Sequence, residues 1–98
     1  MNDALIGALK HRNRREILTH IVEKGEPVSP KQASEELEEP LSNLSYHVRV
    51  LKSAGALILV DQQPIRGSIQ NFYIPNPQVT GAAWVREVLE LPSEDDEA

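Results

Sequence analysis

One stretch of the sequence, residues 41–54, mixes aliphatic side chains with short polar, aromatic and basic ones. At about 100° per residue, a helix over this stretch places its aliphatic residues on one side and a polar, non-acidic set on the other. The polar set contains Ser42, Asn43, Ser45, Tyr46 and Arg49. Hydroxyl and amide groups donate and accept hydrogen bonds, and a guanidinium donates through a bidentate fork. This face can therefore bind phosphates and the edges of nucleic-acid bases.

Three arginines outside this stretch are further candidates for contact with phosphate. Arg14 and Arg15 belong to a basic cluster at the start of a predicted helix, where the alternative is a charged face that is only solvated. Arg66 stands beside Gly67 in a predicted turn, where its side chain is well placed to reach a phosphate. Phosphate contacts of this kind position a protein on a nucleic acid without reading its sequence.

Four helices are predicted in the first half of the chain, from apolar residues at helical spacing and from residues that favour helix ends. Gly25 is expected in the left-handed conformation that ends a helix. Ser29 and Pro30 favour an N-cap followed by a first helical turn, while Pro40 and Gly55 bound the next helix. The predicted helices cover residues 3–9, 12–24, 30–38 and 41–54.

A β-hairpin is predicted after these helices. Residues 56–60 and 68–74 are β-prone, and Pro64 and Gly67 favour a turn over residues 61–67 between them. The fold class is therefore α+β and mostly helical. It is a winged helix-turn-helix, in which the two-stranded hairpin forms the wing and a C-terminal helix follows for dimerisation.

The last predicted helix covers residues 81–91, with Thr80 as its cap. Its apolar stripe is wide enough to serve the core and a second surface together, and the first helix is apolar as well. We therefore predict a homodimer in which these two helices meet. The alternative is that the last helix only covers the core of its own domain. The predicted interface residues are Leu5, Ile6, Leu9, Trp84, Val85, Val88 and Leu89.

The composition is that of a single globular domain. The chain has 98 residues, of which 40% are hydrophobic and 26% are charged. Residues 1–92 are predicted to form one domain, and residues 93–98 a disordered acidic tail. No apolar run reaches the roughly 18 residues of a membrane span, and no secretory signal is visible. These features predict a cytoplasmic protein without membrane contact.

The charges and residue types also exclude several functions. The net charge is -5, but the last six residues hold four of the 15 acids, which leaves 11 acids against 10 bases in the rest. A local basic patch must then supply any contact with DNA. The absence of cysteine excludes disulfides, thiolate metal sites and cysteine nucleophiles. Since no carboxylate pair, activated nucleophile or glycine-rich phosphate loop can be assembled, we expect neither an enzyme nor a cofactor.

Two segments of the sequence resemble one family of regulators. LSNLSYHVRVLKSAGALIL, residues 41–59, and RGSIQNFY, residues 66–73, resemble the ArsR-type winged helix-turn-helix regulators, especially their actinobacterial variants. The resemblance extends over residues 4–74. It implies a homodimeric, sequence-specific DNA-binding transcriptional regulator, expected to be a repressor. Its recognition helix, residues 41–54, would enter the major groove of double-stranded DNA, with the wing, residues 57–74, on the DNA backbone.

The chain departs from the metal-sensing members of that family, which place cysteines near the recognition helix or acids and histidines on the last helix. It has no cysteine and no histidine after His47, so no metal site is expected. His47 itself falls at the edge of the apolar face, and an alternative for Tyr46 is packing under the wing. The alternative function is a winged-helix module that binds another protein and not DNA, which the acidic net charge favours. No small-molecule effector can be identified from the sequence.

Overall fold

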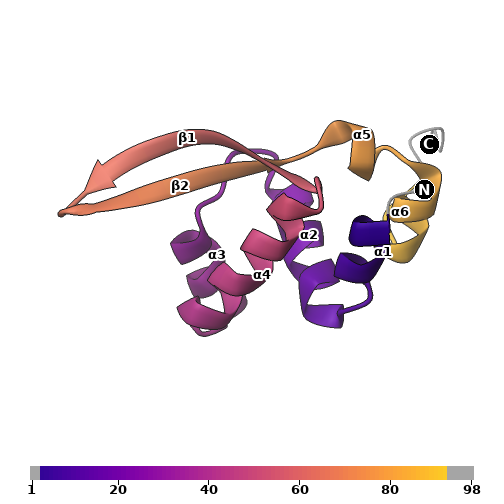
Figure 1. Cartoon of the computed structure of the whole chain (residues 1–98), viewed down its shortest axis with the longest axis horizontal. Helices are drawn as coiled ribbons and strands as arrows, with labels where there is room; N and C mark the ends of the chain where they lie inside the picture. The colour runs from indigo at the N-terminus through magenta and orange to yellow at the C-terminus, as the bar shows by residue number, and fades with distance from the viewer. Residues whose placement is uncertain (1–2, 93–98) are drawn as a thin grey trace.

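The computed structural model describes residues 3–92 and begins with four helices (Figure 1). They are α1 (Asp3–Leu9), α2 (Arg12–Lys24), α3 (Pro30–Leu37) and α4 (Leu41–Ser53). The predicted helix ends are confirmed to within one residue. Gly25 ends α2 with a φ of 68°, and Ser29 Oγ accepts a hydrogen bond from the Gln32 N–H at 3.1 Å at the start of α3. The acidic tail predicted over residues 93–98 lies outside the described residues.

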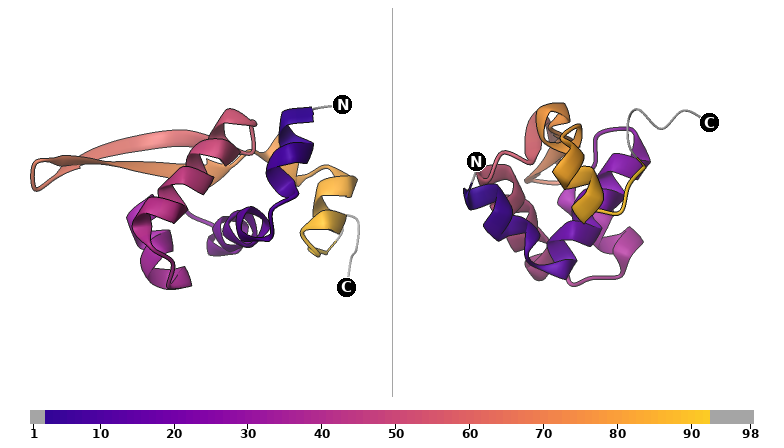
Figure 2. Two further views of the ribbon diagram at one scale, coloured as in Figure 1. Left: turned by 60° about the horizontal axis from the view of Figure 1, so that its bottom comes forward. Right: turned by 90° about the vertical axis from the view of Figure 1, so that its right-hand side faces the viewer.

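The wing is an antiparallel hairpin of β1 (Leu57–Ile65) and β2 (Ser68–Pro75). It projects away from the helices, and the molecule measures 44 Å along its longest axis against 29 and 23 Å along the others (Figures 1 and 2). Pairing continues up to the two-residue turn at Arg66–Gly67, so the predicted turn over residues 61–67 is wrong. Pro64 stays within β1 because each strand of a two-stranded sheet has a free edge, where a missing N–H is tolerated.

Hydrogen bonds tie the base of the wing to the helices. Val28, in the loop between α2 and α3, exchanges two backbone hydrogen bonds of 2.9 Å with Tyr73 of β2. Asn76, directly after β2, donates from Nδ2 to the Gly55 carbonyl at 2.8 Å and from its backbone N–H to the Ala56 carbonyl at 2.9 Å. The wing therefore keeps a defined position beside the end of α4.

The C-terminal region contains two short helices, α5 (Pro77–Thr80) and α6 (Ala83–Val88). Asn76 Oδ1 caps α5 by accepting a hydrogen bond from the backbone N–H two residues later, at 3.1 Å. Thr80, predicted as the cap of the last helix, is instead the buried last residue of α5. The last helix is therefore present but shorter than the predicted residues 81–91, and its cap is Ala82 and not Thr80, because the asparagine cap starts a separate helical turn before it.

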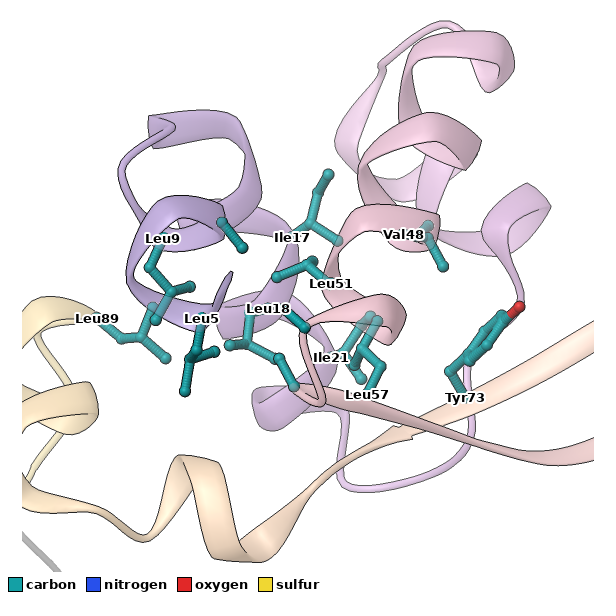
Figure 3. Packing of buried hydrophobic residues seen from close by; sticks show 14 of the residues in the cluster. Leu5, Leu9, Ile17, Leu18, Ile21, Val48, Leu51, Leu57, Tyr73 and Leu89 are labelled. Atoms are coloured by element: carbon teal, nitrogen blue, oxygen red, sulfur yellow. The ribbon is translucent and has the colours of Figure 1, made fainter. Parts of the chain in front are cut away.

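One hydrophobic core joins the helices to the base of the wing (Figure 3). Leu18 and Ile21 of α2 and Leu44 and Leu51 of α4 are among its most completely buried side chains. Tyr73 of β2 belongs to the same cluster. Because α4 is packed along one whole side, its opposite side is presented to solvent in a fixed orientation.

Candidate nucleic-acid interface

The outer face of α4 carries the side chains that the sequence predicts as contact residues. Ser42, Asn43, Tyr46 and Arg49 are exposed, and Ser45 is half-buried. The Tyr46 side chain is 55% exposed, so the alternative of packing under the wing is wrong. These residues form what we call the outer face of α4: a hydroxyl- and amide-rich first turn followed by a phenol and a guanidinium. No acidic residue occurs in α4.

A groove of about 360 Å³ runs between α4, the start of α3 and β2. Ser45 and Arg49 line it from α4, and Ser68 and Asn71 line it from β2. Lys31, in the first turn of α3, lines the same groove and was not predicted as a contact residue. The packing of α3 against α4 brings the Lys31 side chain to the groove. Nothing in the local sequence distinguishes Lys31 from an ordinary solvated lysine, so the sequence alone could not identify it. The α4–wing groove thus combines hydrogen-bonding side chains with two positive charges.

Arg66 occupies the tip of the wing. It is exposed and has a φ of 51°, in the left-handed region, followed by Gly67 with a φ of 81°. Two successive residues with positive φ make the tight turn that suits the twist of a two-stranded hairpin. Arg66 therefore belongs to the turn that joins β1 and β2 at the tip of the wing, and the wing projects away from the helices (Figure 1).

The arginines at the start of α2 do not lie on the α4–wing groove. Arg14 is only 7% exposed. Arg15 Nη1 donates to the carbonyl oxygens of Leu9 and Lys10 at 2.8 and 2.9 Å, which satisfies acceptors at the end of α1. Phosphate contact by Arg14 and Arg15 remains a prediction, and these structural roles do not support it.

The acidic residues of α3 are partly neutralised by α2. Glu36 accepts a hydrogen bond from Lys24 Nζ at 2.9 Å, and its second oxygen lies 2.7 Å from His20 Nε2. These contacts, with Lys24 the strongest, lower the pKa of Glu36 to about 2. At least one carboxylate of the acidic third helix is therefore directed towards α2 and not towards the α4–wing groove.

The residues predicted for the dimer interface divide into two groups. Leu5, Leu9, Val85 and Leu89 are buried in the core of their own chain. Trp84 and Val88 of α6 are 39% and 40% exposed, and Ile6 of α1 is half-buried. The apolar stripe of the last helix thus serves the core with one side and leaves large apolar side chains on the other.

Two kinds of feature are missing from residues 3–92. None of the helices in this range combines the length and the apolar character needed to cross a membrane. No three histidine, aspartate or glutamate side chains in this range are grouped so that they could hold a metal ion.

Comparison with known proteins identifies the family. A family model described as a helix-turn-helix domain matches residues 9–60, just over half of the chain. Among solved structures, reduced HlyU from Vibrio cholerae N16961 has a similar fold, with a TM-score of 0.64 and 22% sequence identity over 89% of this chain and 79% of that one. No curated protein matches the chain. The chain shares the winged helix-turn-helix fold with the solved structure. The resemblance drawn from the sequence is confirmed: the chain belongs to the helix-turn-helix domain family and is a DNA-binding transcriptional regulator of the ArsR type.

Proposed function

We propose that the chain is a homodimeric repressor that binds a specific, pseudo-palindromic site on double-stranded DNA. In this proposal α4 enters the major groove and the wing lies along the adjacent backbone. The observation that carries it is the α4–wing groove, where Ser45 and Arg49 of the outer face of α4 line one space together with Ser68 and Asn71 of β2. The repressor role rests on the resemblance to ArsR-type regulators, and it predicts that operator occupancy lowers transcription of a linked reporter gene.

In this proposal, different residues contact the bases and the phosphates. Tyr46 and Arg49, in the middle of the outer face of α4, reach base edges, and a bidentate arginine–guanine pair gives Arg49 the larger role. Ser42 and Asn43 lie in the first turn, where their side chains and the free N–H groups of the helix end favour a phosphate. Lys31, which lines the groove, and Arg66, at the tip of the wing, add phosphate contacts.

Dimerisation adds a second α4 helix and a second set of positive charges for binding DNA. One copy offers only a few positive charges to DNA within a chain whose net charge is -5. Two copies related by a two-fold axis would present two α4 helices to successive major grooves, about 34 Å apart. Trp84 and Val88, exposed on α6, together with half-buried Ile6 on α1, are the apolar surface that supports this contact.

A fluorescence anisotropy titration against genomic fragments, at two salt concentrations, tests the proposal. We expect saturable, salt-sensitive binding to one fragment and much weaker binding to the others, because base contacts add to a shared phosphate term. The acidic net charge favours the alternative of a protein-binding module. Equally weak binding to every fragment at both salt concentrations would support that alternative and contradict sequence-specific recognition.

A further inference from the structure

The wing carries the most exposed large apolar side chain of the described residues near its tip. Ile69 of β2 is 67% exposed, and Tyr46 of α4, which follows it in this order, is 55% exposed. Pro64 of β1 lies opposite Ile69 in the antiparallel register and is exposed as well. We call Pro64 and Ile69 the apolar pair of the wing tip. Because burial of apolar surface is favourable, another molecule that covers this pair gains free energy.

Ile69 lies on the side of the wing that borders the α4–wing groove. Side chains of a strand alternate between two faces, so Ile69 shares a face with Tyr73, four residues later in β2. Tyr73 is buried in the core, and Ile69 lines the groove together with Arg49 of α4. Ile65 of β1 belongs to the next register pair, and therefore to the opposite face, and it does not line the groove. The tip thus has two exposed isoleucines on opposite faces.

The charge of the wing favours DNA as the molecule that covers the apolar pair. Residues 62–75 contain no acidic side chain, and Arg66 is their only charged residue. The minor groove of DNA attracts guanidinium groups, and its base steps accept apolar side chains such as isoleucine and proline. Since Ile69 and Arg49 line one groove, a DNA molecule held by the outer face of α4 is continuous with the surface of the wing tip.

The wing is long enough for this contact. Tyr73 is packed in the core together with Val48 of α4 (Figure 3). Four strand residues, at about 3.3 Å each, place Ile69 about 13 Å further along the wing. The major groove of DNA is about 12 Å wide. A wing that starts beside an α4 helix in the major groove therefore passes the flanking phosphates and brings its tip to the adjacent minor groove.

We propose that the apolar pair of the wing tip inserts into the minor groove beside the α4 site, unstacks a base step and bends the DNA. The inference rests on the proposed binding of DNA and adds deformation of the site to its recognition by α4. Apolar side chains inserted in this way bend DNA by about 20–90°. Pyrimidine–purine steps unstack most easily, so the chain prefers a TA or CA step at the wing position without hydrogen bonds to its bases.

Resonance energy transfer between dyes at the two ends of a DNA fragment measures the bend. The fragment is the one selected by the anisotropy titration, and the protein saturates it, so that a loss of affinity is not mistaken for a loss of bending. The wild type should raise the transfer efficiency above that of free DNA, and Ile69→Ala should return it close to the free value. Ile65→Ala is the matched control and should keep the wild-type bend, because it removes the same atoms from the opposite face of the tip.

Three results would overturn the proposal. One is a wild-type complex with the transfer efficiency of free DNA, and another is an Ile69→Ala complex that bends DNA as the wild type does. The third is an equal loss of bending in Ile69→Ala and Ile65→Ala, since the effect would then follow from a weaker strand and not from the side chain that borders the groove.

The fluorescence of 2-aminopurine, an adenine analogue that brightens when it is unstacked, locates the insertion. Placed in turn at the positions that flank the α4 site, it should brighten at one step in each half-site with the wild type and not with Ile69→Ala. A bend without any brightened step would contradict insertion.

A random DNA fragment at low salt separates this proposal from sequence recognition by α4, because phosphate contacts hold the chain on any sequence. A bend of the random fragment that is lost in Ile69→Ala would support insertion even if no fragment is preferred in the anisotropy titration. A preferred fragment that stays straight would support recognition by α4 and overturn insertion.

Discussion

Single residues determine how the stability of this chain depends on pH. Burial, with Arg14 and His11 nearby, holds the pKa of His47 below its ordinary 6.5, against a small opposing effect of Glu39. The unfolded chain therefore binds the His47 proton more tightly. The resulting stability is present above pH 6.5 and is lost as the pH falls through the lowered pKa. We expect urea midpoints in phosphate-free buffer to fall across this range for the wild type and much less for His47→Gln. An equal fall in both chains would contradict the prediction.

A second pH window belongs to Glu36. Its ion pairs with Lys24 and His20 lower its pKa from 4.5 to about 2, so its contribution to stability is present above 4.5 and is lost as the pH falls towards 2. Glu36→Gln should flatten the acid limb of the stability curve below 4.5 and leave the limb near 6.5 unchanged. The change in stability caused by Glu36→Gln should be small, because exposed ion pairs are screened by solvent. His47→Gln is the reciprocal control, since it should change only the limb near 6.5.

Substitution of the residues proposed to contact bases should affect DNA binding differently from substitution of the residues proposed to contact phosphates. Arg49→Ala and Tyr46→Ala should each cost about 1–3 kcal/mol of binding to the specific site and much less on random DNA. Lys31→Ala should weaken binding to both and reduce the salt slope by about one per protomer. Arg12→Ala, an exposed arginine outside the α4–wing groove, is the control. Equal losses on specific and random DNA for all the variants would show that α4 touches only phosphates.

At the scale of elements, the tip of the wing depends on the backbone conformation of Gly67. A Cβ there meets no atom within 4 Å, so the only penalty of Gly67→Ala comes from its φ of 81°. That penalty is about 1–2 kcal/mol, equivalent to roughly 5–30-fold faster amide hydrogen exchange in β1 and β2. Gly7→Ala is a matched control: its Cβ also meets nothing, but its position in α1 favours alanine and should stabilise the chain. Unchanged exchange in the Gly67→Ala wing would contradict the left-handed turn.

Elements with strong local signals could be predicted from the sequence, and those set by tertiary contacts could not. Helix caps such as Gly25 and Ser29 act within a few residues, so α1 to α4 were predicted closely. The length of β1 depends on cross-strand pairing, which overrides Pro64 as a turn residue. The same distinction applies to the site. The outer face of α4 follows from helical periodicity, whereas Lys31 joins the groove, and Arg14 leaves the surface, only through packing between helices.

For the whole molecule, the proposed dimer links two weak half-site contacts into one strong one. Trp84 is the largest apolar side chain exposed on α6, so Trp84→Glu should prevent a second copy from covering that surface without opening the core. We expect a dimer for the wild type and a monomer for Trp84→Glu by light scattering at equal concentration, with DNA affinity reduced at least tenfold, about 1.4 kcal/mol. Val60→Glu, at an equally exposed apolar position on the wing, should remain dimeric. A wild-type chain that is monomeric at micromolar concentration would exclude the proposed interface. The α4 helices would then have to bind DNA one at a time.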